Sequence, residues 1–451
     1  SRRSSDLAGA MPFLQDSFIQ LVVRLFLSVA LVVAAVVAFI ALGRGGLASE
    51  AGMPVDPEAA KRKVAGIRAD VLVLIGTAVA VALFAVIVQN KEIAGWILTI
   101  TGIVALGYIL FEAVARSTLI ERHRLYVVLI LMFFSLLFWA FFEQAGSSIN
   151  NFTDRNVARS LGDKAVAAAD VGQTIQFRIV SKTDDPELAK LPALGQAQLG
   201  YENAEPAAAA QIERAIRADG EKAIESKDTD EAKKKERESL EKLVSRVKEE
   251  KRFTLSSLSA LRTAAAKEDA PAEAKVLPWR ISEQNVGMTL AIGEIPASEF
   301  QAANPIFILL LGLVFSALWS FLGSRGREPS TTVKFALGLM QLGLGFGALW
   351  YAAKGADARG MTTIFWLLLG YLLHTTGELC IAPVGLSMVT KLSPKRMVST
   401  VMGAWFLATS FSNYLAGMIA TLTGVSGEEG DELFIPAPTE SVHVYGSVFG
   451  Q

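Results

Sequence analysis

Residues 371–396, YLLHTTGELCIAPVGLSMVTKLSPKR, form an apolar run that carries a carboxylate, Glu378, near its middle. A charged side chain at membrane depth costs roughly 2.5–3.5 kcal/mol on the more lenient insertion scale, so such residues usually face a polar cavity, a partner charge or a proton pathway. Gly377 precedes Glu378, and Pro383 follows it and removes a backbone donor. The stretch therefore predicts a membrane helix that holds a buried carboxylate.

The rest of the chain is also too apolar for an average soluble protein, because 52% of its 451 residues are hydrophobic. Eight apolar runs are each long enough to cross about 30 Å of hydrocarbon at 1.5 Å per residue. They lie at residues 18–42, 71–89, 94–115, 126–145, 305–323, 333–352, 361–390 and 398–423. The predicted fold class is an all-α polytopic membrane protein with about eight transmembrane helices.

Charge and cysteine content narrow the classes of partner. The net charge of −1 gives no indication of a nucleic-acid partner. The single cysteine, Cys380, excludes an intrachain disulfide and a thiolate metal cluster, and it is interpreted as a small apolar residue within a helix. The three histidines, His123, His374 and His443, share no metal-ligand or catalytic-triad spacing. We therefore expect no metal site, no catalytic residues and no enzyme activity.

Basic residues gather in particular loops between the apolar runs, at residues 61–68, 116–124, 324–334 and 392–396. The positive-inside rule places such loops in the cytoplasm. The remaining connections, including the acidic stretch 428–432, then face the other side. A multi-pass protein of a bacterial inner membrane is the expectation.

Residues 155–295 differ in character from both flanks and predict a soluble α/β or coiled-coil insertion, expected outside the cytoplasm. QTIQFRIV (173–180) alternates in the manner of a strand, and VGMTLAIGEI (286–295) does much the same. Residues 207–267 have helical spacing with breaks expected at Gly220 and 228–230, which indicates a helical hairpin or short coiled coil. Its apolar stripe comprises Leu240, Val244, Val247, Leu255, Leu258 and Leu261.

A second acidic residue, Glu143, lies at the end of an apolar run, in the sequence FFEQAGSSINNFTDRN (141–156). Trp139 precedes it by four residues, so the two share a helix face. On position alone, Glu143 is equally consistent with an interfacial carboxylate near a helix end, with the terminus at residues 146–148. Elsewhere, the GxxxG spacing of Gly343, Gly345 and Gly347 predicts close helix packing.

The two acidic residues and their aromatic neighbours fit substrate and proton handling better than catalysis. A carboxylate removed from water retains its proton more readily and can load one near neutral pH. His374 lies four residues before Glu378 and either modulates it or packs as a neutral core residue.

Four motifs carry a family resemblance. FWAFFEQAGSS (138–148), FQAANPIFI (300–308), GELCIAPVGLSMVTKLSP (377–394) and MGAWFL (402–407) resemble the C-terminal half of the proton-dependent oligopeptide transporters, a branch of the major facilitator superfamily. The resemblance covers about 120–155 and 296–451. It implies a partial major facilitator fold: residues 1–154 supply helix six (18–42), a two-helix hairpin and helix seven, residues 155–295 are inserted, and residues 296–451 supply helices eight to eleven and the start of twelve.

The resemblance also implies site residues. Glu143 matches the helix-seven proton-coupling carboxylate, which pairs with an arginine of helix one. Glu378 matches the helix-ten carboxylate, which binds the peptide amino terminus and can pair with a helix-four lysine. Asn304 matches an amide that contacts the peptide backbone. The matching pocket aromatics and adjoining residues are Trp139, Trp405, Phe406 and Thr409.

This chain departs from the family pattern in its long insertion and in Ala382, where a serine is common. The family's ExxER motif and helix-four lysine are not found in it. The implied partners are a di- or tripeptide, the lipid bilayer and an N-terminal half of the carrier, with the proton as coupling ion and no other cofactor.

The implied function is proton-coupled symport of di- and tripeptides across the inner membrane by alternating access. One alternative is a related carrier for nitrate or a muropeptide, although Glu378 argues against an anion by repelling it. Another alternative is a transport-inactive relative whose insertion binds an envelope partner. The pair of carboxylates argues against a pure scaffold, which would not need them.

Overall fold

The computed structural model describes residues 63–64, 67–68, 71–79, 91–422 and 437–450, except for 163, 181–182, 184, 227–228, 251 and 268. The chain divides into two units, Ser1–Ala94 and Gly95–Gln451. In the first unit, β1 (Lys63–Val64) pairs antiparallel with β2 (Ile67–Arg68), and residues 71–79 are helical. The span predicted at 18–42, residues 80–89 of the span predicted at 71–89 and the acidic stretch 428–432 lie outside the described residues.

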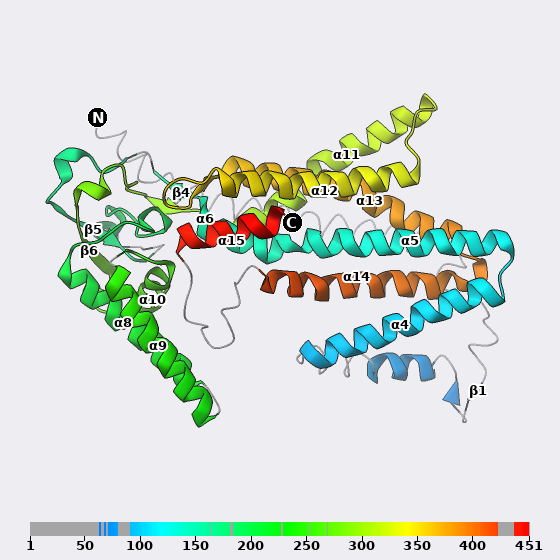
Figure 1. Ribbon diagram of the computed structural model, residues 1–451, viewed down its shortest axis with the longest axis horizontal. Helices are drawn as coiled ribbons and strands as arrows, with labels where there is room; N and C mark the ends of the chain where they lie inside the picture. The colour runs from blue at the N-terminus through cyan, green and yellow to red at the C-terminus, as the bar shows by residue number, and fades with distance from the viewer. Residues whose placement is uncertain are drawn as a thin grey trace, which may run out of the picture. The chain divides into compact units, whose positions relative to one another are not determined.

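Long apolar helices dominate the second unit (Figure 1). Five helical segments of the described chain are long and apolar enough to cross a membrane: Ile93–Ala115, Leu119–Asn156, Ala297–Ser324, Thr331–Lys354 and Ile364–Leu392. The helices are α4 (Lys91–Ala115), α5 (Leu119–Phe142), α11 (Ala303–Ser324), α12 (Thr331–Lys354), α13 (Ile364–Leu392), α14 (Val398–Thr421) and α15 (Pro438–Gly450). The predicted all-α polytopic membrane class is confirmed, with a helix over each run from 94–115 onwards outside segment 155–295.

One end of the bundle is closed by the tight turn between α4 and α5. Thr118 caps α5 through a reciprocal pair, in which the Glu121 N–H donates to Thr118 Oγ1 and the Thr118 N–H donates to Glu121 Oε2. Arg396, from the connection between α13 and α14, donates to Glu121 Oε1 (3.2 Å) and to the carbonyl of Arg116 (3.0 Å). This turn therefore ties α4 to the helices that follow it.

α12 and α13 approach closely through glycines seven residues apart. A Cβ on Gly377 would lie 2.8 Å from the carbonyl oxygen of Gly338, and one on Gly345 would meet the ring of His374. Of the glycines predicted to pack, Gly343 and Gly347 make no close approach within the described part of the chain, because a Cβ on either would have no neighbour within 4 Å there. The GxxxG prediction is therefore wrong except at Gly345, which works together with Gly338.

Segment 155–295 builds its own apolar core. Strand β5 (Thr174–Arg178) pairs antiparallel with β6 (Val276–Arg280), and helices α8 (Pro206–Glu225), α9 (Asp230–Glu250) and α10 (Leu255–Ala265) pack with them (Figure 1). Trp279 and Phe177 are fully buried in this core. The short elements are β3 (Val157–Ala158), β4 (Ser160–Leu161), η2 (Ala168–Asp170), α7 (Pro186–Ala189), η3 (Gln196–Gln198), η4 (Ala272–Lys275), η5 (Glu283–Asn285), β7 (Gly293–Glu294) and η6 (Ala297–Ala302), and η7 (Lys395–Met397) precedes α14.

Two expectations for this segment need correction. Gly220 does not break the helix but lies buried inside α8, where a Cβ would meet the Leu240 side chain at 2.5 Å, so the glycine allows α8 and α9 to pack closely. The strand-like alternation at 286–295 yields only the two-residue strand β7, and β5 pairs with β6. The helical hairpin itself is present, and the predicted stripe is buried or partly buried in the core.

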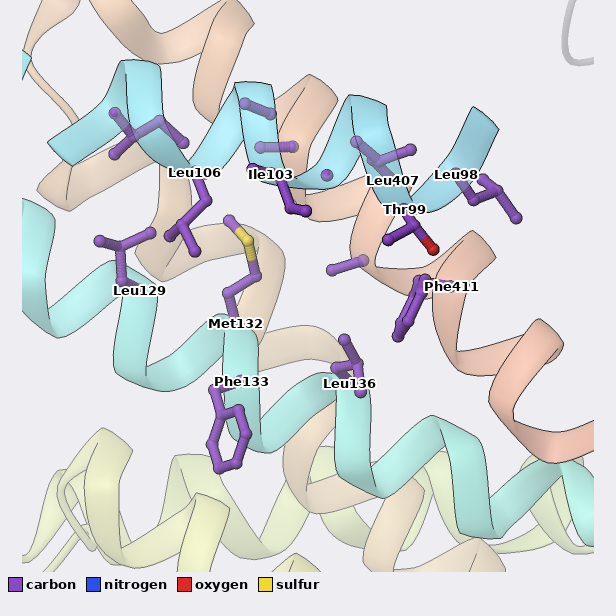
Figure 2. Close-up of a pocket in the computed structure, with 15 residues that line it drawn as sticks. Leu98, Thr99, Ile103, Leu106, Leu129, Met132, Phe133, Leu136, Leu407 and Phe411 are labelled. Atoms are coloured by element: carbon purple, nitrogen blue, oxygen red, sulfur yellow. The ribbon is translucent and has the colours of Figure 1, made fainter. Parts of the chain in front are cut away.

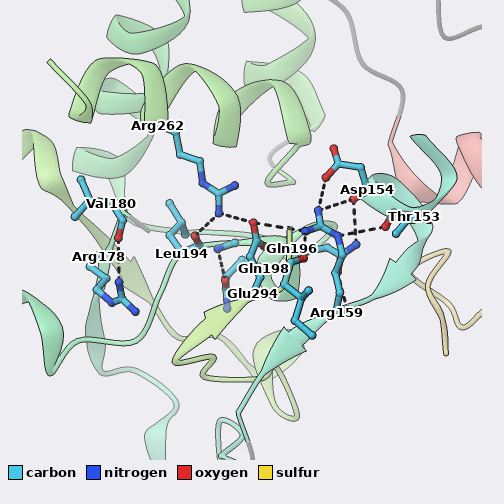
Figure 3. Close-up of polar contacts among 12 residues, drawn as sticks. Thr153, Asp154, Arg159, Arg178, Val180, Leu194, Gln196, Gln198, Arg262 and Glu294 are labelled. Atoms are coloured by element: carbon cyan, nitrogen blue, oxygen red, sulfur yellow. Dashed lines mark hydrogen bonds and ion pairs between the residues drawn. The ribbon is translucent and has the colours of Figure 1, made fainter. Parts of the chain in front are cut away.

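The two ends of segment 155–295 meet in an ion-paired cluster (Figure 3). β4 pairs antiparallel with β7, where Glu294 contacts Arg262 Nη2 at 2.7 Å and accepts from the Gln196 N–H at 2.9 Å. Arg159 lies 3.9 Å from Glu294 and also pairs with Asp154 of the preceding helix. Burial alone raises the pKa of Glu294, but the charges of Arg262 and Arg159 and the Gln196 N–H outweigh it, so the pKa lies below its ordinary value.

A further junction joins segments far apart in the chain. β3 pairs parallel with β8 (Thr362–Thr363), directly before α13. The buried Asn156 donates from Nδ2 to the carbonyls of Gly360 and Pro438, both at 2.8 Å, and accepts from Ser441 Oγ. Gly360 has φ +77°, and a Cβ there would collide with the Pro438 carbonyl, so only glycine fits.

Candidate functional site

Glu378 lies midway along α13, where it meets the first turn of α11. The side-chain amide of Asn304 donates to Glu378 Oε2 at 3.0 Å and to Thr375 Oγ1 at 3.1 Å. Thr375 Oγ1 in turn donates to the Tyr371 carbonyl, so it is free to accept from Asn304. The structure thus brings together two predicted site residues, Asn304 and Glu378.

Thr375 is a contact that the sequence analysis does not predict. Its signal in the sequence is its position three residues before Glu378, which places both on one helix face. Because the hydroxyl and the carboxylate both accept from one amide, Thr375 fixes the orientation of Asn304.

Glu143 lies at a helix interruption rather than inside a helix. α5 ends at Phe142, Glu143 opens the 3₁₀ turn η1 (Glu143–Gly146), and α6 (Ser148–Asn156) continues the rod. The expected helix terminus at 146–148 is present as a short break: η1 ends at Gly146 and Ser147 is not helical, but the chain resumes as α6 at Ser148. The Glu143 side chain is exposed in this chain, within range of a charge–charge interaction with Glu378.

The side chain of Gln144 stabilises this helix interruption through hydrogen bonds, and the sequence analysis assigns no role to Gln144. Its buried Nε2 donates to the carbonyls of Ala140 and Ala416, both at 3.1 Å, and its Oε1 accepts from Ser148 Oγ at 2.7 Å. These bonds fasten η1 to α14 and to α6. Gln144 is therefore a positioning residue for Glu143.

The predicted aromatic residues fall into two groups. Trp139 is half-buried and makes edge contacts with Phe138 and Phe142, one turn before Glu143. Trp405 of α14 is buried against α13, where its ring lies over Gly385. Gly385 is seven residues beyond Glu378, about 10 Å along the helix, so Trp405 does not adjoin the Asn304–Glu378 pair.

The two other predicted residues of α14 differ in exposure. Phe406 is 58% exposed, whereas Thr409 is half-buried and donates to the carbonyl of Trp405 at 3.2 Å. Among the described residues, Glu378 accepts its side-chain hydrogen bond from Asn304 of α11, and no residue of α14 takes part in that bond. The exposed ring of Phe406 can therefore contact a group outside the described residues.

His374 is a core residue beside the site. It is 2% exposed, and its ring lies 4.8 Å from that of Phe346 and 6.4 Å from that of Phe142, measured between centroids. The geometry matches the alternative in which a neutral histidine packs between α12 and α13. Its role in modulating Glu378 has no supporting contact among the described residues.

No lysine or arginine in the described part of the chain forms an ion pair with Glu143 or Glu378. A charged carboxylate at membrane depth without a cation is costly, so each must be protonated or must pair with a group from elsewhere. The acidic pair, the amide and the neighbouring aromatics define a polar site at membrane depth in a multi-pass helical protein.

Comparison with known proteins finds similarity to one family. Residues 278–434 match the POT family model, PTR2. Peptide transporter YePEPT of Yersinia enterocolitica is 42% identical over 128 residues, which is 28% of this chain and 25% of that protein. Dipeptide and tripeptide permease B of Aeromonas hydrophila is 37% identical over 156 residues, covering 34% of this chain and 30% of that protein.

Two solved structures are similar in part. A peptide transporter POT in complex with sulfate has 19% identity and a TM-score of 0.42, covering 85% of this chain and 49% of that one. Tetrameric PepTSo2 has 20% identity and a TM-score of 0.44, covering 92% and 55%. The chain therefore spans about half the length of these structures, and its sequence matches span 25% to 30% of the curated relatives above.

Proposed function

We propose that this chain forms part of a proton-coupled symporter for di- and tripeptides that works by alternating access in a bacterial inner membrane. The observation that carries the proposal is the Asn304–Glu378 pair at membrane depth, 3.0 Å apart and without a cation among the described residues. A carboxylate there can bind an ammonium group, and the amide can bond to a peptide backbone.

The match of residues 278–434 to the POT family model supports the proposal. The two curated relatives above are named as peptide transporters or permeases, and neither name denotes an enzyme. The peptide termini and amides keep a fixed spacing while side chains vary, so a site with a carboxylate, an amide and aromatic walls can accept many sequences. Trp139, Phe406 and Thr409 are proposed to contribute to these walls, whereas Trp405 is buried against α13 away from the pair. Glu143 is proposed to carry the coupling proton.

Transport requires cationic side chains that pair with Glu143 and Glu378. The proposal places these cations in an N-terminal bundle contributed by another part of the carrier. Residues 1–451 reconstituted alone in liposomes should show no dipeptide accumulation when an inward proton gradient is imposed. Co-reconstitution with an N-terminal half from a relative should restore it. Robust accumulation by residues 1–451 alone would contradict the requirement for a second bundle.

The same proposal places segment 155–295 on the extracytoplasmic side, opposite the basic turns. Single cysteines at exposed positions such as Glu283 and Arg116, in a Cys380→Ala background, should react with a membrane-impermeant maleimide from opposite faces of the membrane. Labelling of both from the same face would contradict this topology.

A further inference from the structure

An apolar cavity of about 310 Å³ lies between α4, α5 and α14, apart from the polar site (Figure 2). Side chains from three helices surround it, among them Leu98, Ile103 and Leu106 of α4, Met132 of α5, and Leu407 and Phe411 of α14. An apolar cavity of about half this size stays free of water and binds benzene, so hydration does not stabilise a space of this kind.

The cavity offers no polar contact that would select a polar ligand. Thr99 has the only hydroxyl among the lining residues described, and its Oγ1 already donates to the carbonyl of Gly95 at 2.8 Å. A hydrocarbon is therefore the chemical class that fits.

The cavity exists because α4 is in close contact with the neighbouring helices α5 and α14 near both of its ends and lies further from them in between. At one end, a Cβ on Gly95 would meet the Tyr414 hydroxyl at 2.5 Å, so the helices are in close contact there. At the other end, Ile109 and Ala113 are fully buried. Between these points the rim residues Ile103 and Phe133 are 66% and 57% exposed, which leaves an entrance at membrane depth.

Basic side chains gather at the end of the bundle nearest Ile109. They are Arg116, Arg122, Arg124, Lys395 and Arg396, against the carboxylates of Glu112 and Glu121. The Arg116 side chain is 66% exposed although it pairs with Glu112, so it can also contact a phosphate. An excess of positive charge at the headgroup level attracts anionic lipid.

The distances suit one leaflet of a bilayer. Arg116 lies seven residues beyond Ile109 and ten beyond Leu106, which correspond to about 10 and 15 Å along a helix. A lipid chain of one leaflet covers about half of the roughly 30 Å hydrocarbon thickness. A chain that starts at Arg116 therefore reaches the cavity.

We propose that this cavity binds one acyl chain of an anionic phospholipid, whose headgroup is held by the basic turn around Arg116. The lipid fills the space between α4 and the bundle and so fixes α4 against α5 and α14. The proposal is independent of peptide transport, because none of the predicted site residues lines the cavity.

The probe is phosphatidylglycerol with a diazirine in one acyl chain, present as a minor component of phosphatidylcholine vesicles that hold the complete chain. After illumination, mass spectrometry should find adducts on peptides 98–109, 129–136 or 404–411. Gly102→Leu adds a side chain at a cavity-lining position where nothing lies within 4 Å of the new Cβ, and we expect this side chain to occupy the cavity. Gly107→Leu is the matched control, since it makes the same change on α4, again with nothing within 4 Å of the new Cβ, at a position that does not line the cavity.

We expect Gly102→Leu to lower these adducts at least about tenfold, Gly107→Leu to leave them unchanged, and a phosphatidylcholine probe with the same diazirine to label several-fold less than phosphatidylglycerol. Should Gly102→Leu fail to insert, Ala408→Leu fills the cavity from α14. Three outcomes would each overturn the proposal. The first is equal labelling of the Gly102→Leu and native proteins, and the second is equal labelling by both lipids. The third is the absence of cavity adducts in the native protein, which would result if another part of the chain covered the cavity.

Discussion

The amide of Asn304 lies 3.0 Å from Glu378 Oε2, which joins the first turn of α11 to the middle of α13 across 74 positions of the chain. An amide orients a carboxylate but does not neutralise it. Glu378 therefore keeps the capacity to bind a cation such as the ammonium group of a peptide.

Glu378→Gln in the complete carrier should weaken binding of free-amine dipeptides by about tenfold more than binding of N-acetylated dipeptides, because a charge-assisted bond is stronger than a neutral one. Competition binding with both peptide series measures the difference. Glutamine can still accept from Asn304, so the site geometry is retained. Equal losses for the two series would sink the assignment of Glu378 to the ammonium group.

Glu143→Gln in the complete carrier should abolish uptake driven by a pH gradient while sparing exchange of labelled for unlabelled peptide. The reason is that exchange needs no net proton movement. Gln144→Ala is the control, because loss of its bonds to Ala416 and Ser148 should disturb η1 and reduce both activities. Gradient-driven uptake that persists in Glu143→Gln would falsify the assignment.

Glu294 should make segment 155–295 sensitive to acid. Its pKa is lowered in the folded state, so the carboxylate contributes stability that is fully present above its ordinary pKa and is lost as the pH falls through the folded value. Glu294→Gln should remove this pH dependence and, at pH 7, destabilise the segment by about 3 kcal/mol, since Arg262 and Arg159 lose a buried partner.

Hydrogen exchange of peptides within 155–295, corrected for intrinsic rates and followed from pH 7 to pH 3, measures this effect. Glu283→Gln is a matched control at an exposed carboxylate. The Glu294 prediction fails if both variants show the native pH profile.

Segment 155–295 should be dispensable for transport if its junction is kept. Leu161 and Gly293 are antiparallel partners, so an Asn-Gly turn can replace residues 162–292 and close β4 and β7 as a hairpin. This design keeps Asn156, Arg159 and Glu294. We expect uptake per inserted carrier to stay within about twofold of native, as for a removed surface insertion. A variant that inserts well but does not transport would show that the segment belongs to the carrier machinery.

Hydropathy predicts the membrane helices well, because one free-energy cost dominates in a run such as 333–352. This is the cost of exposing unpaired backbone N–H and C=O groups to lipid, and a helix avoids it by pairing these groups with one another. The observed helix, Thr331–Lys354, extends the run by only two residues at each end. Asn304 and Glu378 likewise stand out by their unusual polarity in apolar surroundings, whereas the contact between them depends on packing across many residues.

Local rules fail where tertiary contacts decide the outcome. Strand β6, VLPWR, is not predicted because Pro278 lacks a backbone donor, yet a two-stranded ribbon leaves one side unpaired and tolerates proline. Gly220 suggests a break, but the close Leu240 side chain explains why glycine is accommodated inside α8. Gln144 and Thr375 carry too weak a signal, since each acts through a distant partner.

The junction at Asn156 has a consequence for biogenesis. Its partners Gly360 and Pro438 lie 204 and 282 positions later, whereas the core around Trp279 is drawn entirely from residues 166–290. Ribosomes deliver about 5–20 residues per second, so the end of α6 must wait roughly 10 s or longer before Gly360 has been synthesised. The core of segment 155–295 can close during that interval, before its membrane attachment at Asn156 is complete.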